Sequence, residues 1–178
     1  MQFKSLFVFV SLPILLFAQT TPAQIESDIS NDLANALAGD ISALEAFPVN
    51  GGTPQEVMAI HQAHLNTNSI LATLTSDFDN ASCPLSDSDA TTILDLLQAQ
   101  VVTLQQAFMD AIAREPAIAN LGDVPIFQSD FVLLKSTSDS LVAAISACIS
   151  ANVVPAADEI ASEIDAAFAS VMAAFGSS

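Results

Sequence analysis

The sequence predicts an all-α protein: an antiparallel up-down bundle of about five amphipathic helices with one disulfide. Three observations support this fold class. Apolar residues recur three or four positions apart through almost the whole chain, which is the spacing of one helix face. Short segments with Pro, Gly or Asn separate these runs, and short loops make consecutive helices antiparallel. Two cysteines, Cys83 and Cys148, fall where such a bundle brings two helix ends together. No run has the alternation typical of a strand.

The first 18 residues are predicted to be a secretory signal peptide. Lys4 supplies a positive charge, and the apolar run over residues 5–18 is too short to span a membrane comfortably. Polar residues follow at once. We expect cleavage between residues 18 and 23 and a single helical-bundle domain over residues 24–176. No later segment is a long continuous apolar run, so we expect a secreted, extracellular protein with no membrane span.

Two helices follow the signal peptide. The first is expected to end at Phe47, because Pro48 and the turn at residues 50–52 interrupt its pattern. Thr53 is then an N-cap, and the Glu56 that follows it completes the signature of a helix start. The positions predicted to be buried are Ile25, Ile29, Leu33, Leu37, Ile41 and Leu44 in the first helix, and Val57, Ile60, His64, Thr67, Leu71, Leu74 and Phe78 in the second.

Three further helices complete the bundle. A cap sequence at residues 86–89 begins the third, which we expect to end near residue 114 because Pro116 breaks the pattern. Residues 122–125 form the next connection, and Pro155 separates the fourth helix from the fifth. The predicted buried positions are Ala90, Leu94, Leu97, Val101, Leu104, Phe108 and Ala111; Phe127, Phe131, Leu134, Ser138, Leu141, Ile145 and Cys148; and Ile160, Ile164, Ala167, Val171 and Ala174, with Phe168 and Phe175 beside the last run.

The mature chain is strongly acidic. Without the signal peptide, Arg114 and Lys135 oppose 20 acidic residues, which gives a formal charge of −18. Nucleic acid and anionic membrane surfaces are poor partners for such a protein, so we expect neither. The same charge keeps a very apolar chain in solution.

Cys83 and Cys148 are expected to form a disulfide, because the chain is secreted and holds no other cysteine. If the second helix runs down, the third up and the fourth down, both cysteines lie at the same end of the bundle. Closing so long a loop is worth about 4 kcal/mol on the chain-entropy model. The disulfide would join the second, third and fourth helices at one end, which leaves the first and last helices as those expected to move.

The aspartate-rich stretch over residues 77–90 is either a metal-binding loop or a connector. A calcium loop needs acids at alternate positions, a central Gly and a Glu at the twelfth position. Counted from Asp77, these positions hold Ala81, Ser82 and Ser88 instead. The acids after residue 86 suit a helix N-terminus. We therefore expect a connector and no metal site.

Asn80 is a candidate for N-glycosylation, because Asn80-Ala81-Ser82 is an acceptor triplet in a chain expected to be secreted.

Three polar residues fall on predicted buried positions: His64, Thr67 and Ser138. Mid-helix positions in an antiparallel bundle have similar heights, so these groups can converge inside an apolar interior. They either bond locally to the backbone or orient a ligand head group in an apolar cavity. Nothing obviously charged is expected to face His64. His61 and His64 lie on one helix, but a zinc site needs further ligands, so no metal is predicted.

No catalytic motif is evident. The chain has no G-x-S-x-G nucleophile elbow and no glycine-rich phosphate loop. Its carboxylates form no pair that differs from ordinary solvated helix faces. We therefore expect a protein that is not an enzyme and needs no cofactor.

The order of helices and short motifs is similar to that of a known family. After the signal peptide come Asp-Ile pairs at residues 28–29 and 40–41, an S-x-x-D-A helix start at residues 86–90 and a long apolar helix. An L-x6-L-x3-I run over residues 134–145 and an alanine-rich last helix that ends in AAFG complete the series. This order resembles the fungal hydrophobic surface-binding protein A family, which also contains the cell-wall galactomannoprotein antigens.

The resemblance implies a small, secreted, helical protein without enzymatic activity, and it implies one of two functions. In the first, the interior of the bundle binds a fatty acid or another apolar ligand. In the second, the protein adsorbs to hydrophobic solid surfaces and helps a secreted, polyester-degrading hydrolase to reach them. The protein would be free outside the cell or associated with the cell wall, although the chain has no Ser/Thr-rich stalk or anchor signal of the kind found in wall-bound members.

The two functions use the apolar residues differently. For adsorption, the bundle opens and lays apolar faces on the surface. For a lipid in the interior, His64, Thr67 and Ser138 are candidates for contact with the head group. The lining is then expected to include Ile60, Leu71, Leu97, Val101, Leu104, Phe108, Phe131, Leu141 and Ile145.

Overall fold

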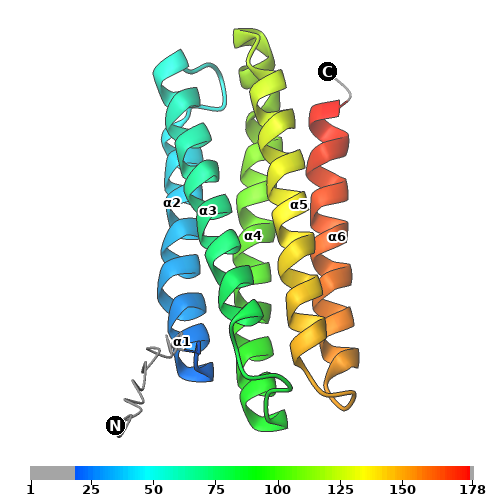
Figure 1. Ribbon diagram of the computed structural model, residues 1–178. Helices are drawn as coiled ribbons and strands as arrows, with labels where there is room; N and C mark the ends of the chain where they lie inside the picture. Colours follow the sequence, from blue (N-terminus) through cyan, green and yellow to red (C-terminus); the bar gives the residue numbers. More distant parts are fainter. Residues whose placement is uncertain (1–18, 177–178) are drawn as a thin grey trace, which may run out of the picture.

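The computed structural model describes residues 19–176, which form five helical rods and contain no strand (Figure 1). The predicted signal peptide, residues 1–18, lies outside these residues. The first rod is continuous and consists of α1, the π-helical segment η1 and α2. The element bounds are α1 (Pro22–Ser27), η1 (Asp28–Leu33), α2 (Ala34–Ala46), α3 (Pro54–Asp79), α4 (Asp87–Leu121), α5 (Val124–Cys148) and α6 (Val154–Gly176). The predicted fold class, an all-α bundle with one disulfide, is confirmed.

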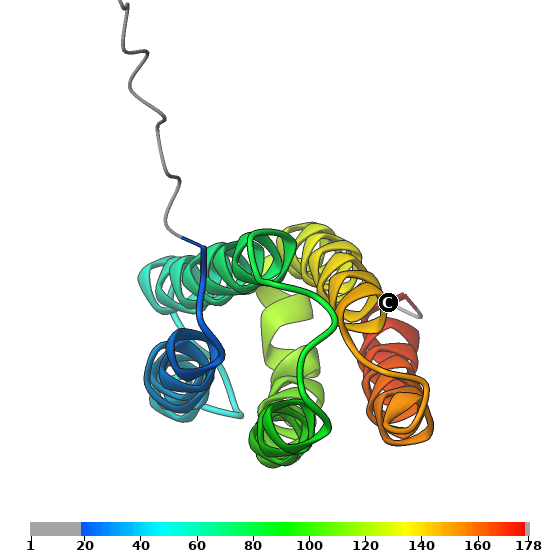
Figure 2. The ribbon, with the colours of Figure 1, turned by 60° about the horizontal axis from the view of Figure 1, so that its bottom comes forward.

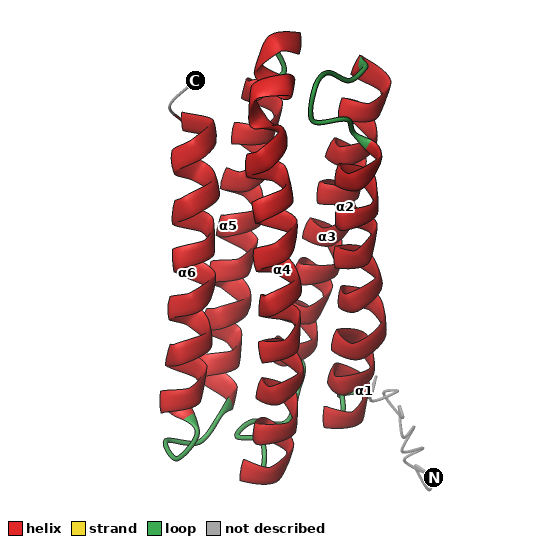
Figure 3. Cartoon of the chain, turned by 180° about the vertical axis from the view of Figure 1, so that it is seen from behind, coloured by secondary structure: helices red, strands yellow, loops and turns green. Residues whose placement is uncertain are grey.

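The rods form two layers. In Figure 2, α3 and α5 lie side by side in one layer, and α2, α4 and α6 lie in the other. Figure 3 shows the molecule from the side of α2, α4 and α6, with α3 and α5 behind them. Consecutive rods run antiparallel, as short loops require. This arrangement surrounds one elongated interior to which every rod contributes.

The predicted caps begin the helices as expected. The Thr53 hydroxyl accepts a hydrogen bond from the Glu56 N–H at 3.3 Å, and the Thr53 N–H donates to the Glu56 carboxylate at 2.8 Å. Ser86 accepts from the Asp89 N–H at 3.1 Å. These side chains satisfy N–H groups that have no partner within the helix.

The predicted end of α4 is wrong. The helix continues through Pro116 to Leu121, where Gly122, with φ of 82°, ends it. Proline removes one backbone hydrogen bond and strains the helix. However, Ala117 and Ile118 directly after it are fully buried in the core. Burial of the turns beyond the proline therefore offsets its cost, and the helix of 35 residues is about 52 Å long.

The buried faces of α3 and α5 follow the predicted spacing at every position. In the outer rods most predicted positions are buried, and the exceptions are replaced by a neighbouring residue. Asp40 is buried in α2 where Ile41 was predicted, and Phe168 and Phe175 are buried in α6 where Ala167 and Ala174 were predicted. These replacements bring an acid into the interior from α2 and large rings into it from α6.

One end of the bundle is held by several contacts. Cys83 and Cys148 form the predicted disulfide, and the Leu85 N–H donates to the Cys148 carbonyl at 2.8 Å. The chain just before α1 is held at the same end, because the Thr20 N–H donates to the Asn80 carbonyl at 3.2 Å. The contact of the first rod with this end was not predicted.

Helix α5 contains a long stretch with few charged residues. Among the described residues, it is the only helix long and apolar enough to cross a membrane, by length and composition alone. It packs between α3 and α6 in the bundle. Core helices of water-soluble bundles pass the same test.

Candidate ligand-binding cavity

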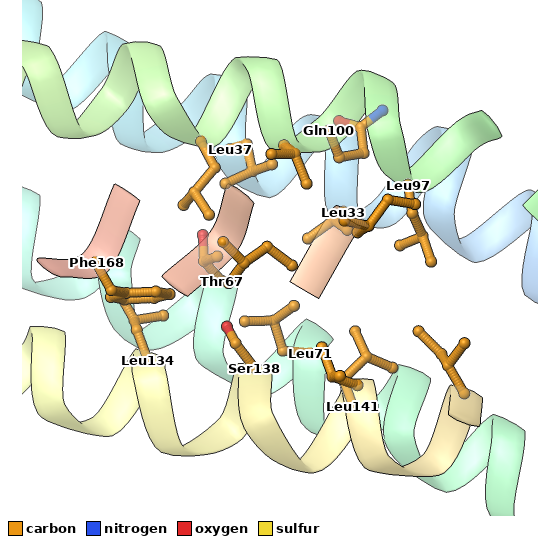
Figure 4. Close-up of a pocket in the computed structure, with 16 residues that line it drawn as sticks. Leu33, Leu37, Thr67, Leu71, Leu97, Gln100, Leu134, Ser138, Leu141 and Phe168 are labelled. Atoms are coloured by element: carbon orange, nitrogen blue, oxygen red, sulfur yellow. The ribbon is translucent and has the colours of Figure 1, made fainter. Parts of the chain in front are cut away.

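A narrow cavity lies between the five rods (Figure 4). Its empty volume, including the space at its mouth, is about 590 Å³, but only a small part of it is wide enough to admit a water molecule. The cavity is therefore a tight crevice. Its lining consists of Leu33, Leu37, Thr67, Leu71, Leu97, Gln100, Val101, Leu104, Leu134, Ser138, Leu141, Val142, Ile145, Ile160, Ile164 and Phe168.

Most of the apolar residues predicted for an interior site meet in this cavity. Those that line it are Leu71, Leu97, Val101, Leu104, Leu141 and Ile145. The other three, Ile60, Phe108 and Phe131, are buried in the core outside the cavity. The lining also includes residues that were not selected as lining, such as Leu33 and Leu37 of the first rod and Ile160 and Phe168 of α6. All four lie on or beside the predicted apolar runs, so the helical spacing itself could have identified them.

Thr67 and Ser138 are the polar residues in the middle of the cavity, on α3 and α5. The Thr67 hydroxyl donates to Oδ2 of Asp40 at 2.7 Å. Ser138 is 6% exposed, and its side chain makes no hydrogen bond with any described residue. The third polar candidate, His64, does not line the cavity.

His64 belongs to a cluster between α3 and α5. Nδ1 of His61 lies 2.9 Å from Oδ1 of Asp130, and Nδ1 of His64 lies 3.3 Å from its Oδ2. The His64 ring also packs against Phe127 and Phe131, with centroids 5.8 and 5.4 Å apart. The expectation that no charge faces His64 is therefore wrong. The buried Asp130 carboxylate joins α3 to α5, and it is one of two buried acids that were not predicted.

The other unpredicted acid, Asp40, lies directly behind Thr67. It is 3% exposed, and its Oδ1 has no hydrogen-bond partner. Burial raises the pKa of the Asp40 carboxyl above its ordinary 3.8, while the nearby His64 and the Thr67 hydrogen bond act in the opposite direction. An ionised oxygen without a partner at such a position is costly.

Aromatic rings close one end of the cavity. Phe168 lines it, and its ring lies 4.8 Å from that of Phe108. Phe131 contacts Phe108 at 5.5 Å and Phe175 at 5.1 Å. These distances are typical of favourable ring packing. The interior thus consists of an aliphatic part that contains the cavity and an aromatic part that is filled.

Asn80, the glycosylation candidate, is exposed at the C-terminal end of α3. Its side-chain amide donates to the Ser76 carbonyl at 2.7 Å. Among the described residues, no group of three or more His, Cys, Asp or Glu side chains is arranged to hold a metal ion.

A family model described as hydrophobic surface binding protein A matches residues 22–147. Comparison with curated protein sequences finds no match. Among solved structures, Afmp4p in complex with palmitic acid is similar, with a TM-score of 0.78 and 23% identity over 87% of this chain and 99% of that one.

Two ligand binding domains of the Penicillium marneffei MP1 protein, each complexed with arachidonic acids, are also similar. Domain 1 has a TM-score of 0.78 and 12% identity, over 87% of this chain and 99% of that one. Domain 2 has a TM-score of 0.79 and 13% identity, over 88% of this chain and 97% of that one. At these identities the similarity establishes a shared fold.

Proposed function

The chain belongs to the hydrophobic surface binding protein A family, and on this premise we propose that it binds a fatty acid or a similar lipid between its helices. The observation that carries the proposal is the cavity itself. Its lining comes from every rod and is apolar except for Thr67, Ser138 and Gln100. Cavities of this kind, largely apolar with a few polar groups, are typical of lipid and small-molecule sites. The solved structures of the same fold contain palmitic and arachidonic acids.

The acyl chain would lie along the aliphatic part of the interior, against Leu71, Leu97, Val101, Leu141 and Ile145. Its head would lie near Thr67 and Ser138. Because the crevice is narrow, the helices must separate slightly to admit an acyl chain. Of the remaining residues predicted to form the site, Ile60, His64, Phe108 and Phe131 would support its wall without touching the ligand.

A pair of adjacent valines on α4 tests this proposal. Val101 lines the cavity, whereas the next residue of the same helix, Val102, is 60% exposed on its outer surface. We expect Val101→Phe to fill the crevice and to weaken palmitic acid binding by about tenfold or more. Val102→Phe should leave it unchanged. Equal binding by both variants, measured by titration of delipidated protein, would contradict a site in this cavity.

Adsorption to hydrophobic solids is the second candidate function, and the outer face of α5 favours it. Val132 and Leu133 are 56% and 41% exposed. They lie in a shallow depression with Gln128, Ser129 and Ser136, none of which carries a charge. A Val132→Ser/Leu133→Ser variant should adsorb more weakly to hydrophobic beads, whereas Val102→Ser, which removes one exposed valine of α4, should not. Unchanged adsorption would exclude this face.

We also propose that the protein acts outside the cell. We expect a secreted protein, free or associated with the cell wall, whose residues 24–176 form one domain. Mass spectrometry of secreted protein would locate the cleavage between residues 18 and 23 and reveal any glycan on Asn80, which is exposed. No activity is expected on ester or glycoside substrates. Recruitment of a hydrolase predicts faster polyester degradation when the protein is added to that enzyme.

A further inference from the structure

Thr67 and Ser138 place two hydroxyl groups on different walls of the cavity, one on α3 and one on α5 (Figure 4). The Thr67 hydroxyl donates its only proton to Oδ2 of Asp40 at 2.7 Å. A hydroxyl has one proton and two lone pairs. Towards a ligand, Thr67 is therefore a hydrogen-bond acceptor.

Ser138 supplies the complementary group. The residue is 6% exposed, its oxygen points into the cavity, and its hydroxyl makes no hydrogen bond to the described residues. Among the described side chains, the buried oxygens without a partner belong to Asp40 and Asp77, so the Ser138 oxygen is open to the space of the cavity. Its O–H can donate to a ligand oxygen. The two side chains thus offer one acceptor and one donor.

The surroundings of this pair are unfavourable for an anion. Asp40 is buried directly behind Thr67, and its Oδ1 has no partner. The titratable groups that face Asp40 are His64 on α3 and Asp130 on α5, and Asp130 also bonds His61. No Lys or Arg is among the described residues that line the cavity.

The one Lys and the one Arg of the described residues are engaged elsewhere. Lys135 pairs with Asp139 and, at 2.9 Å, with Asp165. Arg114 donates to the Phe47 carbonyl at 3.1 Å. A lipid carboxylate in the cavity would therefore have no Lys or Arg partner, and His64 does not line the cavity.

We propose that the cavity selects lipids whose head group is an uncharged hydroxyl, such as a fatty alcohol or the protonated form of a fatty acid, over the carboxylate of the same chain. Asp40 is the specificity-determining residue. This inference rests on the proposed lipid-binding function and specifies its ligand class.

The selection follows from hydrogen-bond and charge matching. An uncharged head group can donate its O–H to Thr67 and accept from Ser138. A carboxylate has no proton to donate, so it would meet the lone pairs of Thr67 with the Asp40 carboxyl behind them. Like charges in a medium of low dielectric constant repel strongly. Burial raises the pKa of Asp40, so as the pH falls this carboxyl takes up its proton before an exposed aspartate does, and the ligand carboxylate is protonated over the same acidic range.

The test compares palmitic acid with 1-hexadecanol, which have equal chain lengths, and uses hexadecane as a probe without a head group. At about pH 7.5 a fatty acid is ionised, and we expect hexadecanol to bind about tenfold more tightly than palmitate. At about pH 4.5 the difference should shrink to within about threefold, through tighter palmitic acid binding at a constant hexadecanol affinity.

Two variants assign the effect to residues. Asp40→Asn keeps the shape but removes the buried charge, so palmitate binding at about pH 7.5 should tighten by about tenfold with little change for hexadecanol. Asp32→Asn, an exposed change of the same charge on the same rod, should alter neither. Ser138→Ala should weaken hexadecanol binding by about threefold to tenfold and leave hexadecane unchanged.

The outcomes separate the two proposals. Binding of all three probes without head-group discrimination, or equal palmitate affinity in wild type and Asp40→Asn, would overturn the selectivity and leave lipid binding intact. No binding of any probe at either pH would overturn the proposed function, and the selectivity with it. An unchanged hexadecanol affinity in Ser138→Ala would overturn the donor assigned here.

Discussion

Asp40 lies on the buried face of the first rod, between Leu37 and Leu44. Its carboxyl has one hydrogen bond, from Thr67, and one oxygen without a partner. Burial raises its pKa above 3.8. The folded state therefore holds a proton more tightly than the unfolded state does. The stabilising contribution of this group is complete below about pH 3.8 and is lost as pH rises through the raised pKa.

This linkage predicts the effect of Asp40→Asn on stability. The variant removes the charge that folding must bury, so it should be more stable than wild type at about pH 7.5, by about 1 to 3 kcal/mol. Below about pH 3.8 the difference should nearly vanish, because the wild-type carboxyl is then protonated in both the folded and the unfolded state. Thermal unfolding followed by circular dichroism at both pH values measures this. A constant difference across pH would show that Asp40 does not titrate as inferred.

Only some of the buried polar residues could be predicted from the sequence. Thr67 and Ser138 were identified because they interrupt apolar runs at helical spacing. Asp40 and Asp130 were missed, because acids are rarely buried and the spacing was completed with the apolar neighbour Ile41 instead. Leu33, Leu37, Asp40 and Leu44 are also spaced three or four residues apart, so the sequence is compatible with a buried Asp40. Only the packing of the helix against α3 shows that Asp40, and not Ile41, is the buried residue.

At the scale of the helix, α6 closes one end of the cavity. Phe168 lines the cavity and packs on Phe108, so the ring forms the boundary between the aliphatic and aromatic parts of the interior. The sequence placed Phe168 beside the buried run and not on it. The burial of Phe168 and Phe175 in place of Ala167 and Ala174 was not predictable, because the alanines and phenylalanines of α6 offer two apolar faces of similar quality. Large rings bury more area and therefore determine the register.

The opposite end of the cavity, on the side of Leu141 and Ile145, should set the length of the preferred ligand. Ile145→Ala keeps an apolar side chain but opens space beyond Leu141. We expect the affinity for an 18-carbon fatty acid to rise relative to that for a 16-carbon one by about tenfold, since each buried methylene contributes about 0.8 kcal/mol. Val132→Ala, an exposed position of the same helix, is the matched control. An unchanged ratio in competition titrations would place the end of the acyl chain elsewhere.

Helix starts could be predicted from the local sequence, whereas one helix end depends on tertiary packing. The caps at Thr53 and Ser86 were predicted because their hydrogen bonds are local. The end of α4 was not, because Pro116 is a local stop signal that burial of Ala117 and Ile118 overrides. The continuation depends on residues of other helices, which the local sequence does not reveal.

For the whole molecule, lipid binding requires the helices to separate, whereas the contacts at one end of the bundle hold them together. The interior is too narrow for an acyl chain as it stands. At one end of the bundle, the disulfide joins Cys83, in the loop after α3, to Cys148 at the end of α5. At the same end, the Asn152 amide, in the loop before α6, donates to Asp87 at the start of α4 at 2.9 Å. Uptake of a lipid therefore requires separation along the rods. Gln98 of α4 donates to Glu163 of α6 at 2.7 Å, next to the lining residues Leu97 and Ile164.

Locking α4 to α6 should consequently slow lipid exchange. In a Gln98→Cys/Glu163→Cys variant joined by a short thiol-reactive crosslinker, we expect uptake and release of palmitic acid to slow by about tenfold or more, because such sites open through motion of whole elements. The control variant is Gln106→Cys/Asp110→Cys, whose crosslink joins two residues one turn apart on α4. It restrains no second helix, so palmitic acid exchange should be as fast as in wild type. Stopped-flow exchange gives both rates. If the α4–α6 crosslink leaves them unchanged, α6 is not the helix that moves, and separation must occur at the first rod.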